Sequence, residues 1–224
     1  MKIGKNLRIL IYVTAACAVI WASVRIAHWL HEYSVLREVV ARLSADSRVA
    51  EVLVTKSEFD ETTKKIRTTI KFLEYDAENH PLPPKYFTFQ GNVIQFQSLV
   101  VRFDDKFVRA GDRLRGKSAC LFMKAFMLDG KNTQTFEITK AGEIPGGYKV
   151  PDVESKFETE IWRDFWKYAL EPDARQRMGI KNAQIEAPGS LFRPGTIYTL
   201  RLEHDGGIRI DTHPIPQVLK GEQL

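Results

Sequence analysis

Residues 111–118, GDRLRGKS, match the phosphate-binding P-loop pattern G-x-x-x-x-G-K-[ST] at every fixed position. In a working P-loop a hydrophobic strand runs into the first glycine, backbone amides curl around the phosphates, and a helix begins at the Lys-Ser pair. Here the loop is the bulky Asp-Arg-Leu-Arg, and the residues before Gly111 form no buried run. This context argues against a nucleotide site. The remaining alternative is that Arg115 and Lys117 bind an anion on a loop.

The segment after Ser118 separates the two interpretations, because a P-loop needs a helix there. With Asp129-Gly130-Lys131-Asn132 as a turn, CLFMKAFML pairs with TQTFEIT, and the facing residues are Met123 and Ile138, Lys124 and Glu137, and Ala125 and Phe136. Apolar residues then meet apolar ones, and one charge meets its opposite. The pattern therefore predicts a strand over 118–128.

The last part of the sequence contains the one local group of residues that resembles a metal site: His204, Asp205, Asp211 and His213. With a three-residue loop, 205–207, the predicted facing pairs are His204 and Ile208, Glu203 and Arg209, Leu202 and Ile210, and Arg201 and Asp211. His204 then lies on the opposite face from Asp211 and His213, so the ligands do not converge. We predict cross-strand ion pairs here and no metal.

Other chemically capable residues also have ordinary structural explanations. Cys120 lies in an apolar strand, as inert buried thiols do, and no serine lies in a G-x-S-x-G motif. Trp162 and Trp166 are expected to pack within the protein rather than to bind a ligand. The sequence thus predicts no catalytic residue, no cofactor and no metal.

The N-terminal segment predicts a membrane anchor. From Ile9 to Val24 it has 16 residues without a charge, and counted to Leu30 it has 22, about 33 Å of helix. Arg25 is expected near the far interface, where Trp21 and Trp29 would belong to the aromatic belt. A cleaved signal peptide and a lipid anchor at Cys17 are alternatives, but the residues after Ala16 stay apolar, which favours an uncleaved helix.

The charges around this segment predict its orientation. Lys2, Lys5 and Arg8 flank one end, whereas bases and acids are mixed at the other, so the N-terminus is expected in the cytoplasm. The chain has a net charge of +5, but residues 1–30 hold four bases and no acid. Residues 31–224 contain 29 Lys and Arg and 28 Asp and Glu, and this balance of charge argues against nucleic-acid binding.

Beyond the anchor, apolar residues recur at spacings of four and three, which predicts a short helical stalk over 31–44. The stripe consists of Trp29, Tyr33, Leu36, Val40 and Leu43. Such a heptad stripe can bind another protein or a second copy, and it is our candidate interaction site. The alternative is that the stripe packs on the chain's own domain.

Residues 45–224 predict a β-rich domain. Ile66, Thr68, Ile70 and Phe72 alternate as on one face of a strand, and 152–170 has apolar residues at helical spacing. We therefore predict an α+β fold that is mostly antiparallel β with one long amphipathic helix. A cytoplasmic tail, 1–8, a single transmembrane helix, 9–30, and the stalk precede it.

This arrangement of tail, membrane helix, stalk and small α+β domain resembles that of assembly components of bacterial envelope machines, such as pilus-alignment and division-scaffold subunits. The resemblance is one of architecture, with no shared motif. It implies an inner-membrane protein with a periplasmic domain that acts as a non-enzymatic interaction module, with envelope proteins or itself as partners. The alternative is an extracytoplasmic enzyme or ligand-binding domain that acts on lipid or cell-wall polymer.

Overall fold

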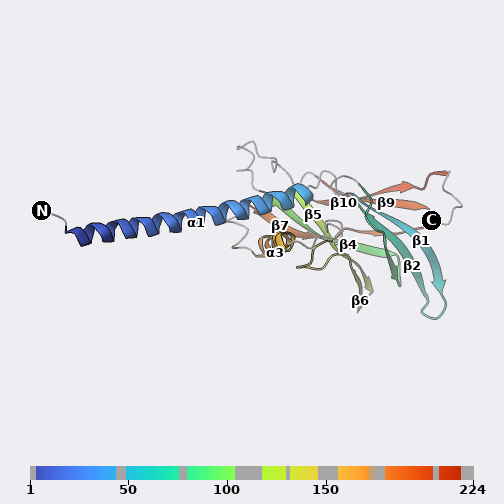
Figure 1. Ribbon diagram of the computed structural model, residues 1–224. Helices are drawn as coiled ribbons and strands as arrows, with labels where there is room; N and C mark the ends of the chain where they lie inside the picture. The colour runs from blue at the N-terminus through green and yellow to red at the C-terminus, as the bar shows by residue number, and fades with distance from the viewer. Residues whose placement is uncertain are drawn as a thin grey trace.

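The computed structural model joins one long N-terminal helix to two packed antiparallel sheets with a second helix, an α+β fold as predicted (Figure 1). It describes residues 4–43, 49–75, 80–103, 118–129, 132–145, 156–171, 173, 180–203 and 207–217. The elements are α1 (Lys5–Leu43), β1 (Val49–Asp60), β2 (Lys65–Glu74), β3 (Lys85–Phe89), β4 (Val93–Phe103), β5 (Ser118–Asp129), β6 (Asn132–Glu137), α3 (Lys156–Leu170), β7 (Ile180–Glu186), β8 (Gly189–Leu191), β9 (Thr196–Leu202) and β10 (Ile208–Pro214).

Helix α1 contains the predicted apolar segment and projects from the domain (Figure 1). Within the part of the chain that the structure describes, Ile11–His31 is the one helical segment long and apolar enough to cross a membrane, and none of it is buried. The helix continues without a break through the predicted stalk as far as Leu43, and it contacts both α3 and β5. Its C-terminal part therefore packs on the domain.

The strands form two sheets. The first sheet has the order β10-β9-β1-β2-β3, and the second has the order β6-β5-β4-β7, with β8 also paired to β4. The predicted alternation on β2 is confirmed: Thr68, Ile70 and Phe72 are buried on one face. Ile66, on the same face, is exposed because the β1–β2 hairpin extends beyond β3 and β9.

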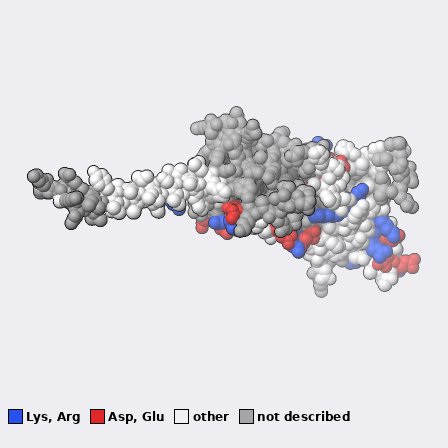
Figure 2. Space-filling view, viewed as in Figure 1, with Lys and Arg blue, Asp and Glu red and all other residues white. Residues whose placement is uncertain are grey.

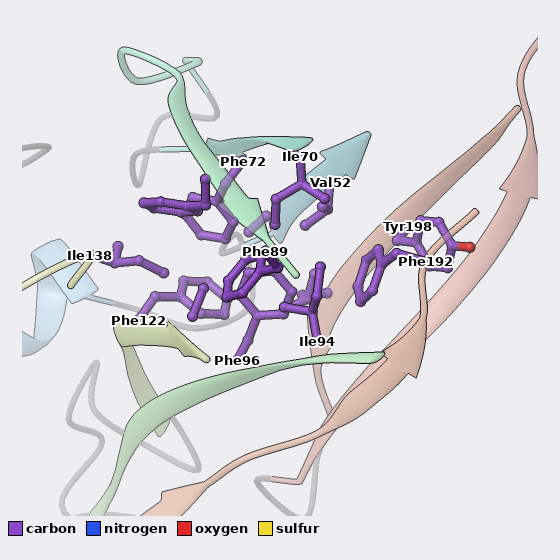
Figure 3. Packing of buried hydrophobic residues seen from close by; sticks show 14 of the residues in the cluster. Val52, Ile70, Phe72, Phe89, Ile94, Phe96, Phe122, Ile138, Phe192 and Tyr198 are labelled. Atoms are coloured by element: carbon purple, nitrogen blue, oxygen red, sulfur yellow. The ribbon is translucent and has the colours of Figure 1, made fainter. Parts of the chain in front are cut away.

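The main core lies between the two sheets and is built largely from phenylalanine (Figure 3). Phe72 from the first sheet stacks on Phe96 of the second at 5.5 Å between ring centroids and meets Phe122 edge-on at 5.4 Å. Phe192, in the loop after β8, contacts Phe96 and the ring of Tyr198. The Tyr198 hydroxyl donates to the Leu191 carbonyl and accepts from the Arg193 amide, which fixes that loop.

A second core fills the space between α3 and the outer face of the second sheet. Trp162, Phe165 and Trp166 pack there with residues of β4 and β5, among them Leu99 and Leu121. These two strands are thus covered on both faces, which explains why consecutive residues of β5, from 120 to 122, are all buried. Helix α3 lies within the predicted range 152–170.

The two predicted hairpin registers have different outcomes. In β5–β6, Lys124 pairs with Glu137 and Ala125 with Phe136, as predicted, and the Ile138 amide donates to the Met123 carbonyl. In β9–β10 the prediction is wrong by two residues. The observed pairs are Leu202 with Ile208, Arg201 with Arg209, Leu200 with Ile210, and Thr199 with Asp211.

The shift is a displacement of the connection by one residue toward the N-terminus: the Glu203 amide donates to the Gly207 carbonyl, whereas the prediction paired His204 with Ile208. A shift of two leaves every side chain on its predicted face, since strands alternate with a period of two. The predicted ion pairs therefore form diagonally, Arg209 with Glu203 at 2.7 Å and Arg201 with Asp211 at 3.6 Å.

Candidate interaction surfaces

The residues with P-loop spacing lie mostly outside the described residues, since the structure describes none of 104–117. The structure describes the chain again from Ser118, the first residue of β5. A strand therefore follows the Lys-Ser pair, as predicted from the β5–β6 pairing, whereas a P-loop requires a helix there. This local structure does not match the phosphate-binding loop.

The other candidate chemistry is accounted for by packing and ion pairs. Cys120 is buried in β5, and the buried Trp166 donates from Nε1 to the Glu143 carbonyl at 2.9 Å. His204 and Asp205 lie outside the described residues. Among the described ones, no group of three or more His, Cys, Asp or Glu side chains is placed to hold a metal ion. Hydrogen bonds from Arg209 hold the pKa of Asp211 below its usual value.

The outer face of the first sheet is covered by polar side chains that pair with one another. Arg209 bridges Glu203 and Asp211 on β9–β10, and Thr69 and Thr88 share a hydrogen bond between β2 and β3. The Tyr75 hydroxyl donates to Glu51 at 2.9 Å; burial and this bond raise the pKa of Tyr75 to about 12. The exposed Tyr86 also lies on this face, but it pairs with Lys71 and, among the described residues, has no exposed apolar side chain paired to it.

The outer face of the second sheet is different, because α3 covers only part of it. Beyond α3, Val93 of β4 pairs directly with Leu191 of β8, and Leu128 of β5 lies on the same face, two residues beyond the Gln95–Phe126 pair. Their side chains are exposed by 53%, 39% and 63%. Single exposed apolar residues are common, but three on adjacent strands form a patch of the kind found at interaction sites. We call Val93, Leu128 and Leu191 the apolar row.

A second exposed apolar pair lies at the end of the β1–β2 hairpin, where Phe59 pairs with Ile66. The opposite face of this hairpin carries the Glu58–Arg67 and Lys56–Glu58 ion pairs. Figure 2 shows charged side chains gathered at this end of the molecule, while few are visible on the described part of the projecting helix α1. The hairpin tip is thus amphipathic, but it presents a smaller apolar surface than the apolar row.

The predicted heptad stripe lies along α1. The Trp29 side chain is 56% exposed, and the side chains of Tyr33, Leu36, Val40 and Leu43 lie outside the described residues. The contacts of α1 with α3 and β5 bring this part of the helix against the domain. Both roles of the stripe, as a site for a partner and as packing on the domain, therefore stay predictions.

No protein-family model, curated protein or solved structure matches this chain.

The apolar row was not singled out in the sequence, although a signal for it exists. In β4 the buried residues Ile94 and Phe96 alternate with Val93, Gln95 and Gln97 on the other face. Val93 is thus an apolar residue on a face that is otherwise polar at this end of the strand. The row exists only because β8 and β5 place Leu191 and Leu128 beside Val93, and these strands are far from β4 or from each other in the sequence.

Proposed function

We propose that this chain is a single-pass protein of a bacterial-type inner membrane. Its domain, 45–224, would lie on the periplasmic side and act as a non-enzymatic interaction module. The apolar, unburied segment Ile11–His31 supports the anchor, and Lys2, Lys5 and Arg8 at one end support a cytoplasmic N-terminus. The predicted stalk, 31–44, would be the outer part of α1, where the helix contacts α3 and β5.

The observation that carries the interaction role is the apolar row. It lies on the same face as the helix α3, which already covers the neighbouring part of the second sheet. An uncovered sheet face with adjacent aliphatic side chains gains free energy when another protein removes it from water, by about 25 cal/mol per Å² buried. The partner would be another envelope protein or a second copy of the chain.

The residues next to the apolar row extend the surface that a partner would cover. A Cβ atom at Gly189 would lie only 2.7 Å from Cγ of Gln95, so the glycine leaves room for that side chain to lie across β8. Next to the row, this face carries Gln95, Phe126 and Thr135 side by side, so an aromatic ring lies between two polar side chains.

The topology is tested with a reporter enzyme that is active only outside the cytoplasm, fused after Leu224. We expect activity, because the positive flank holds the N-terminus inside and the single helix carries the rest across. A fusion after Arg8, which lacks the helix, is the control and should be inactive. Activity of a cytoplasm-only reporter after Leu224 would contradict the proposed orientation.

A further inference from the structure

Arg25 is the only Lys, Arg, Asp or Glu between Ile9 and Leu30. It lies five residues before Leu30, about 7.5 Å along the helix axis from the end of the apolar segment. A charge at this depth is unfavourable unless it reaches water or finds a counter-ion. The guanidinium of Arg25 lies over the ring of Trp21, and the side chain of Glu32, two turns further along α1, lies outside the described residues.

Two tryptophans lie on the same face of α1 as this arginine. The guanidinium carbon of Arg25 lies 5.9 Å from the centroid of the Trp21 ring, one turn toward the N-terminus. Trp29 follows one turn toward the C-terminus, at the i+4 position. The side chains of Trp21 and Trp29 are exposed by 68% and 56%, so this face of the helix is open to its surroundings.

We infer that Trp21, Arg25 and Trp29 form a binding site for the phosphate group of a phospholipid in the leaflet next to the domain. This inference rests on the membrane anchor proposed above. The phosphodiester supplies a negative charge at the level of Arg25, and a guanidinium can hold two of its oxygens at once. Indole rings favour the level of the lipid headgroups, which places the two tryptophans beside the same phosphate.

A lipid is favoured over free phosphate because the site lies on an apolar helix, where an ion would have to leave water to reach Arg25. A phospholipid brings its phosphate to this depth with its acyl chains against the apolar residues on the same face toward the N-terminus, such as Ala18 and Ala22. A lipid held there would fix the depth and rotation of α1. Because α1 packs on α3 and β5, it would also fix how the domain faces the membrane.

The test is a titration of the full chain in detergent with phosphatidylglycerol, followed by native mass spectrometry of the bound lipid. We expect Arg25→Gln to raise the Kd about tenfold, the effect of removing one hydrogen-bonded charge pair. Binding of diacylglycerol with the same acyl chains, which lacks the phosphate, should be unchanged. Inorganic phosphate should not displace the phospholipid. An unchanged Kd in Arg25→Gln, or displacement by inorganic phosphate, would overturn the inference.

The matched control moves the charge without removing it. In Arg25→Gln with Ser23→Arg the arginine stays at nearly the same depth but lies about 160° around the helix, away from both tryptophans. We expect this variant to bind as weakly as Arg25→Gln. A Kd restored to that of the unaltered chain would show that charge alone attracts the lipid, and it would overturn the three-residue site.

Alkaline carbonate extraction of membranes separates this inference from the proposed anchor. The unaltered chain and each variant should stay in the membrane pellet, since the apolar segment is intact. If they do and the lipid titration fails, only the phosphate site is wrong. Release of the unaltered chain into the supernatant would contradict the anchor, and the phosphate site with it.

Discussion

Replacing Phe72 by alanine is expected to lower the free energy of unfolding of the domain by about 3 to 5 kcal/mol. The side chain is 1% exposed and joins the two sheets, because it belongs to β2 and contacts Phe96 of β4 and Phe122 of β5. Its removal leaves a cavity lined by rings that cannot collapse without moving both sheets. Urea unfolding of the full chain in detergent, followed by near-ultraviolet circular dichroism, measures the loss.

The matched control for this prediction is Phe59→Ala, which removes the same atoms from the exposed end of the β1–β2 hairpin. The Phe59 side chain is 61% exposed, so we expect a loss below about 1 kcal/mol. Equal losses in the two variants would mean that the space between the sheets is not the main core.

The second large effect is expected in the outer part of α1, in Leu36→Asp with Val40→Asp. Helix α1 contacts α3 and β5, so we expect the stripe to share in this packing. Two aspartates placed there should lower the free energy of unfolding of the domain by at least about 3 kcal/mol, as expected when buried aliphatic side chains are lost. The same urea titration measures it.

A control with the same change of charge is Ser34→Asp with Arg42→Gln, at positions outside the stripe. It should leave the stability nearly unchanged. If Leu36→Asp with Val40→Asp instead keeps the stability of the unaltered chain and loses crosslinks between full-length chains, the stripe is a site for a partner and not part of the core. The two outcomes thus decide between the two roles of these residues.

The parts of the fold that the sequence predicted well are those where local patterns act alone. The uninterrupted apolar segment predicts α1, and alternation in 66–72 predicts the buried face of β2. The β5–β6 register also follows from its side chains, because a one-residue shift would place Lys124 opposite Phe136. In each case the energetic preference is set by residues close together in the chain.

The parts that could not be predicted depend on contacts between distant segments. Two β9–β10 registers can pair the same charges, and the observed one joins Glu203 to Gly207 by a backbone hydrogen bond. The burial of both faces of β4 and β5 depends on α3 from one side and the first sheet from the other. The apolar row likewise needs β8, β4 and β5 side by side, which no local pattern specifies.

The central claim, that the domain binds another protein through the apolar row, is tested by photo-crosslinking in native membranes. The photoreactive amino acid benzoylphenylalanine replaces Leu128 in the row or, as a control, Tyr86, which is exposed on the outer face of the first sheet. The account predicts a discrete crosslinked species, with a second copy or another protein, from position 128 and none from position 86. Crosslinking that is absent at position 128, or equal at both positions, in a folded and membrane-integrated chain would contradict it.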